Sequence, residues 1–68
     1  MDPDANLVEQ RSISNAVLRM LDTIPDGGKL IPIQRAVLCT YTARLADLTK
    51  ALDEWIKGGG CLPKEWTR

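Results

Sequence analysis

Apolar side chains recur through the second half of the chain at alternating steps of three and four residues. This spacing places them on one face of a helix, because an α-helix turns once every 3.6 residues or so. The series, called the heptad seam below, continues for nearly three heptads: Leu38, Tyr41, Leu45, Leu48, Leu52 and Trp55. A seam of this length predicts one long helix, over about residues 32–57, that buries a continuous apolar face against other helices.

A second, shorter helix is expected upstream, over about residues 4–23. Its apolar residues also recur at steps of three and four and so share one face: Ile13, Val17, Met20, Leu21 and Ile24. Two starts are open for this helix. Asp2 can cap it with Pro3 at the first helical position, and Asn6, three residues before Glu9, forms another N-terminal signature.

The segment between the two expected helices, residues 24–31, contains proline and glycine, which favour a reversal of the chain. Pro32 then suits the first position of the second helix. The run Gly58–Gly60 is typical of a helix end and leaves residues 58–68 as a glycine hinge and a short tail. The sequence therefore predicts an all-α fold, in which residues 1–57 form a two-helix antiparallel hairpin.

This hairpin is expected to pair with a second copy of itself. Apolar partners in the first helix lie mainly between Ile13 and Ile24, so the later part of the seam is expected to lack cover within one chain. The residues concerned are Leu48, Leu52, Trp55 and Ile56. Two hairpins that pair into a four-helix bundle would supply the missing cover. We therefore predict a homodimer with the heptad seam as its oligomer interface, in a parallel or an antiparallel arrangement.

Composition argues against several functions. The 68 residues include nine basic, nine acidic and no histidine residues, so the chain is formally neutral. A neutral chain neutralises phosphates poorly, which disfavours nucleic acid as a partner. No run approaches the ~18 uncharged apolar residues that cross a bilayer, so no membrane partner is expected. Without histidine, we expect no catalytic residues, no metal and no cofactor.

The two cysteines indicate a reducing compartment. Cys39 and Cys61 lack the spacing of a zinc site, and two reduced thiols are the usual state in the cytosol. The sequence starts with acidic residues, where a secretory signal would be basic and then apolar. A cytoplasmic protein is expected.

Two groups of residues are candidate binding sites. Trp66 lies after the glycine hinge, and it either folds back over the helices or anchors another protein, because tryptophan is frequent at binding hot spots. The candidate partner-binding group consists of Trp66, Leu62, Trp55 and Ile56. A weak candidate anion site precedes the second helix, where glycine amides and basic side chains can meet a phosphate. Its residues are Gly27, Gly28, Lys29 and Arg35.

These features predict a small non-enzymatic protein–protein interaction module that acts as a homo-oligomer. It would serve as an adaptor or an inhibitor that occupies a partner protein's surface, a form found among phage and mobile-element proteins. This analogy depends on form alone. Two alternatives stay open. One is a DNA-associated regulator, because helix–turn–helix is the predicted order, although the second helix is long for a recognition helix. The other binds a small anionic ligand at the oligomer interface, near Lys29 and Arg35.

Overall fold

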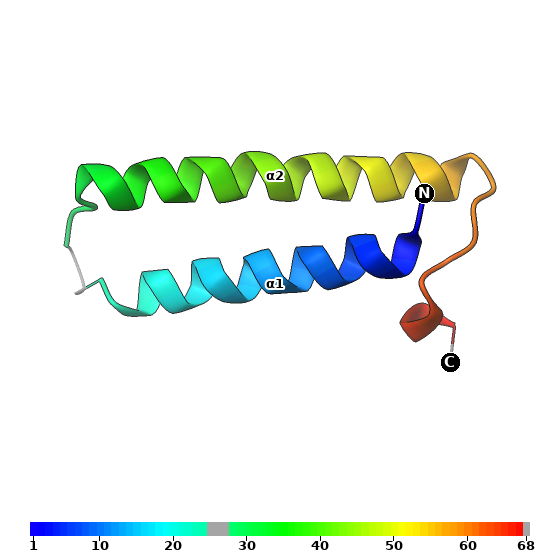
Figure 1. Ribbon diagram of the computed structural model, residues 1–68, viewed down its shortest axis with the longest axis horizontal. Coiled ribbons are helices and arrows are strands. Elements are labelled where there is room, and N and C mark those ends of the chain that lie inside the picture. Colours follow the sequence, from blue (N-terminus) through cyan, green and yellow to red (C-terminus); the bar gives the residue numbers. More distant parts are fainter. Residues whose placement is uncertain (25–27, 68) are drawn as a thin grey trace.

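Two antiparallel helices and a C-terminal tail make up the protein in the computed structural model, which describes residues 1–24 and 28–67 (Figure 1). Helix α1 spans Pro3–Asp22, helix α2 spans Pro32–Lys57, and a short 3₁₀ helix, η1, spans Lys64–Trp66. No strand occurs in the described residues, and α1 packs against α2, so the prediction of an all-α hairpin is confirmed there. The turn residues 25–27 lie outside the described residues.

Helix α1 begins at the earlier of its two predicted starts. Asp2 is the N-cap, and its Oδ1 accepts hydrogen bonds from the backbone N–H groups of Asp4 (3.0 Å) and Ala5 (3.1 Å). Pro3 follows at the first helical position, where its missing N–H costs nothing. The alternative start at Asn6 is wrong, because Asn6 lies inside α1 with its side chain buried. The early start lengthens α1 by a turn.

Helix α2 has a side-chain contact at its start and glycine at its end. The backbone N–H of Ile31 donates to Oε1 of Gln34 (3.1 Å), and Pro32 opens the helix. Gly58 caps the other end, and Gly59 takes a φ of 91°, a backbone conformation that side-chain-bearing residues rarely adopt. The chain therefore leaves the helix axis at Gly59.

The core is a narrow layer between α1 and α2. Its buried apolar side chains are Ile13, Leu48 and Leu52, the last only 3% exposed. The expectation that Leu48 and Leu52 lack cover within the chain is therefore wrong, because Asn6 and Gln10 of α1 lie against this part of α2. Trp55 and Ile56 are half-buried.

The molecule is a rod. Its extents are 44 × 22 × 16 Å and its radius of gyration is 14.8 Å, whereas a compact domain of this length has about 11 Å. Such a shape leaves a large surface for its volume. None of the helices within residues 1–24 and 28–67 is both long and apolar enough to cross a membrane.

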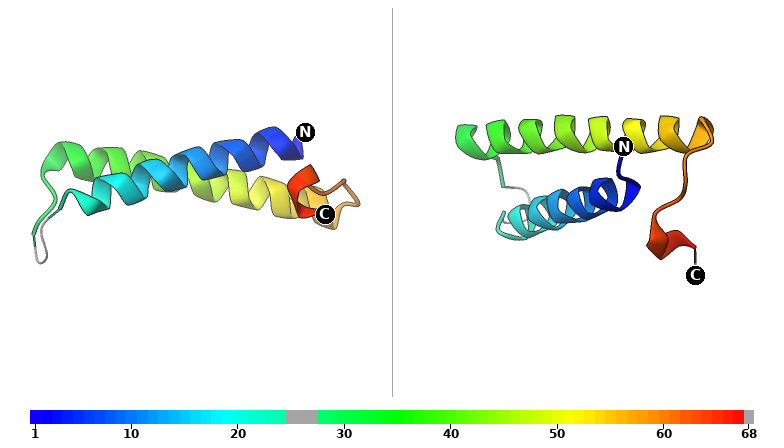
Figure 2. Two further views of the ribbon diagram at one scale, coloured as in Figure 1. Left: turned by 90° about the horizontal axis from the view of Figure 1, so that it is seen from below. Right: turned by 45° about the vertical axis from the view of Figure 1, so that its right-hand side comes forward.

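The tail folds back over the open end of the hairpin, beside the start of α1 (Figure 2). Pro63 is completely buried there. The backbone N–H of Lys64 donates to Oδ1 of Asp4 (2.7 Å), and Glu65 forms an ion pair with Arg11. These contacts hold η1 against the first turns of α1.

Candidate functional site

A chain of polar side chains fixes how α1 lies on α2. The Nδ2 of the buried Asn6 donates to the backbone carbonyl of Leu48 (3.0 Å), and its Oδ1 accepts from Nε2 of Gln10 (2.6 Å). The Oε1 of Gln10 in turn accepts from Oγ1 of Thr49 (3.3 Å). Gln10 and Thr49 therefore lie on the same side of the helix pair.

The opposite side of the helix pair is charged. The guanidinium of Arg44 donates to both carboxylate oxygens of Glu9, from Nε at 2.6 Å and from an Nη at 2.8 Å. These hydrogen bonds and the positive charge of Arg44 hold the pKa of Glu9 below its ordinary value, and Glu9 raises the pKa of Arg44. On this side of the hairpin, the ion pair between Glu9 and Arg44 therefore links α1 to α2.

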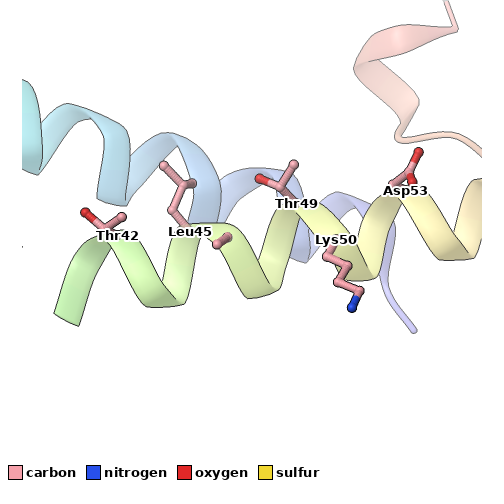
Figure 3. A pocket seen from close by; sticks show the side chains of 6 residues that line it. Thr42, Leu45, Thr49, Lys50 and Asp53 are labelled. Atoms are coloured by element: carbon pink, nitrogen blue, oxygen red, sulfur yellow. The ribbon is translucent and has the colours of Figure 1, made fainter. Parts of the chain in front are cut away.

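The Thr49 side of α2 carries an open, mainly apolar groove of about 680 Å³. We call its lining the groove face: Thr42, Leu45, Ala46, Thr49, Lys50 and Asp53. Figure 3 shows Thr42, Leu45 and Thr49 projecting from one side of α2, with Asp53 at the end of the row and Lys50 turned away. The charged groups are at one end of the groove, and its middle is uncharged.

Two leucines of α1 are also exposed. Leu21 lies three helical turns beyond Gln10 and so on the same flank of α1 as Gln10. Leu21 is 46% exposed, and Leu18, next to it on the helix surface, is 60% exposed. These two leucines add exposed apolar surface on α1 to that of the groove face on α2.

The residues of the predicted heptad seam lie on the face of α2 that packs on α1. Leu48 and Leu52 are buried, and the other four are half-buried. Tyr41 also borders a smaller hollow near the start of α2, together with Ile33 and Val37. Because α1 occupies the seam, a second copy has more surface available on the groove face.

The four predicted partner-binding residues are brought to the same end of the hairpin, with different exposure. Trp55 packs on Gly60, and its indole N–H donates to the backbone carbonyl of Cys61 (2.9 Å). Ile56 and Trp66 line a hollow of about 250 Å³ at the end of the groove face. Trp66 is folded back yet 49% exposed, and Leu62 is 42% exposed. Binding of another protein by this group stays a prediction.

The candidate anion site lies only partly within the described residues, and it stays a prediction. Gly27 lies outside them, and Gly28, Lys29 and Arg35 are exposed. Gln34 already occupies the N–H of Ile31 at the start of α2. Cys39 and Cys61 are both free thiols on the surface.

Sequence reasoning missed the groove face. Its signal is a second series along α2, displaced from the heptad seam by about a quarter turn, in which Thr42, Ala46, Thr49 and Asp53 recur at steps of four, three and four. The series is easily overlooked because only one of these residues is apolar.

The fold and the surface define a class of protein: a two-helix hairpin with a folded-back tail and an open apolar flank. No known protein family model, no curated protein and no solved structure matches this chain.

Proposed function

We propose that this chain is a non-enzymatic protein–protein interaction module whose working form is a homodimer, with two hairpins paired through their groove faces into a four-helix bundle. The observation that carries the proposal is the apolar flank formed by the groove face, Leu18 and Leu21. Exposed apolar surface gathered outside the core commonly marks an interaction site.

The exposed area supports a second copy as the occupant. The chain exposes 5181 Å², whereas a compact monomer of its mass would expose roughly 4,200 Å². The excess of roughly 900 Å² is similar to the ~800 Å² that each partner buries in a standard interface. Burial of the groove face in a dimer would bring the surface of each chain close to that of a compact protein.

Charge also permits self-association. Nine basic and nine acidic residues cancel, so two copies approach without net repulsion. The charged Glu9–Arg44 side of the hairpin then faces water, and the uncharged middle of the groove faces the partner. Depletion of charge is typical of the core of an interface.

Sedimentation equilibrium at micromolar concentration, with a reductant present, tests the proposal. We expect a dimer for the wild type and a monomer for Ala46→Glu, because this substitution buries two uncompensated carboxylates at the centre of the interface. Ala43→Glu is the matched control, since Ala43 is also exposed and, unlike Ala46, does not line the groove. A wild-type monomer, or equal dimerisation by all three proteins, would contradict the proposal.

A further inference from the structure

We infer that the second copy lies antiparallel on the groove face, so that Arg35 of each chain binds Asp53 of the other. This inference rests on the proposed homodimer and specifies which residues meet in it.

The groove-face series extends toward the start of α2 with the same spacing. Including Arg35, it reads at steps of four and three: Arg35, Cys39, Thr42, Ala46, Thr49 and Asp53. An antiparallel pair of helices with a two-fold axis near residue 44 brings together three kinds of pair. Thr42 meets Ala46, Cys39 meets Thr49, and Arg35 meets Asp53. The small side chains at the centre permit close approach of the two copies of α2.

The charges at the two ends of the series have opposite sign, and this selects the direction of the second copy. In the antiparallel arrangement, each Arg35 meets an Asp53 of the other copy, and the two ion pairs form about 27 Å apart along α2. A parallel arrangement would place Arg35 against Arg35 and Asp53 against Asp53, and like charges in contact are unfavourable.

The surroundings of Asp53 fit an incoming guanidinium. Asp53 borders the hollow of about 250 Å³ that is also lined by Trp66. Guanidinium groups bind carboxylates and stack on aromatic faces, so this hollow offers both kinds of contact to the partner's arginine. Lys57 already pairs with Asp53 within the chain (3.0 Å), but both side chains are more than half exposed, which makes that pair weak. The carboxylate can therefore accept a second cation.

Charge reversal tests the pairing in the full-length protein. Arg35→Asp and Asp53→Arg each turn two attractive pairs into two repulsive ones, so we expect each variant alone to dimerise about tenfold more weakly at low salt. An equimolar mixture of the two variants, and the double variant R35D/D53R, should recover dimerisation to within about threefold of the wild type. Circular dichroism checks that each variant stays helical.

Cysteine cross-linking tests the same register independently. In a Cys61→Ser background, the added substitution Thr49→Cys should give a disulfide-linked dimer on oxidation with copper–phenanthroline, through Cys39 and the new thiol. The background alone should not cross-link, because its two Cys39 residues lie about 15 Å apart along the helices and a disulfide needs Cα atoms within about 7 Å.

The outcomes separate this inference from the proposed function. A wild-type dimer that neither charge reversal weakens, or rapid cross-linking through Cys39 in the background protein, overturns the antiparallel register and leaves the homodimer standing. A wild-type monomer removes both. Recovery in the mixture, together with the cross-link between Cys39 and the thiol introduced at position 49, supports the register, since only opposed Arg35 and Asp53 produce both results.

Discussion

At the scale of single residues, two small features decide how the open end of the hairpin is built. The buried side chain of Asn6 reaches the backbone of Leu48, so a polar residue in the weakly apolar half of α1 becomes part of the interface between the helices. Gly60 lies directly on the indole of Trp55, where a larger residue would not fit. Neither role follows from residue type alone, because both depend on what the other helix places nearby.

We expect Gly60→Ala to lower the free energy of unfolding by about 1–3 kcal/mol, because its Cβ would overlap the Trp55 ring and the ring or the tail must move. Thermal unfolding and tryptophan fluorescence measure the loss and the displaced indole. Gly58→Ala is the matched control, since its Cβ would lie 3.4 Å from the nearest atom, the Glu54 carbonyl oxygen, an ordinary contact. Equal stability of the two variants would contradict the packing of Trp55 on Gly60.

At the scale of the elements, α1 and α2 are joined by different chemistry on their two sides. The groove side has the hydrogen bonds from Asn6 through Gln10 to Thr49, and the other side has the Glu9–Arg44 ion pair. The apolar core between them contains few residues, so these polar contacts set the register of the two helices.

The ion pair predicts a pH dependence. Arg44 holds the pKa of Glu9 below its ordinary value, so the folded state binds this proton more weakly than the unfolded state. The pair therefore stabilises the fold above about pH 4.5 and loses its effect as the pH falls through the lowered pKa. The stabilisation of the folded state by this pair is small, because both side chains are exposed.

A double-mutant cycle with Glu9→Gln and Arg44→Gln, measured by urea unfolding, checks this dependence. We expect a favourable coupling at pH 7 that fades as the pH falls through the lowered pKa of Glu9. A coupling that stays constant across this range would show that the two side chains interact through something other than charge.

At the scale of the whole molecule, the tail completes the hairpin. Pro63 is buried, Lys64 and Glu65 contact α1, and Trp66 lies at the end of the groove face. The tail that follows the glycine hinge thus covers one end of the rod, while the groove face stays exposed.

We expect a chain that ends at Gly60 to unfold at a lower temperature than the full chain, because it loses the burial of Pro63 and both contacts to α1. Calorimetry at several protein concentrations measures the shift. Lys64→Ala is the control, since it removes an exposed side chain but keeps the backbone N–H that binds Asp4. An unchanged melting temperature in the truncated chain would mean that the tail does not contribute to the fold.

Local sequence patterns are sufficient to place the two helices and to predict that they pair. These features depend on local chemistry: the periodicity of the heptad seam, Pro32 at a helix start and glycine at a helix end. The helix predicted over residues 32–57 has the bounds found for α2 because its signals are strong at both ends.

What covers the later part of the seam, and which surface stays exposed, depends on how the two helices pack. Asn6 and Gln10 look like poor core residues in isolation, yet they cover Leu48 and Leu52 because their amides find partners on α2. Helix α1 therefore packs on the heptad seam within one chain, and the groove face is the surface that stays exposed. Burial and hydrogen bonding between distant residues depend on the arrangement of both helices, which no local pattern specifies.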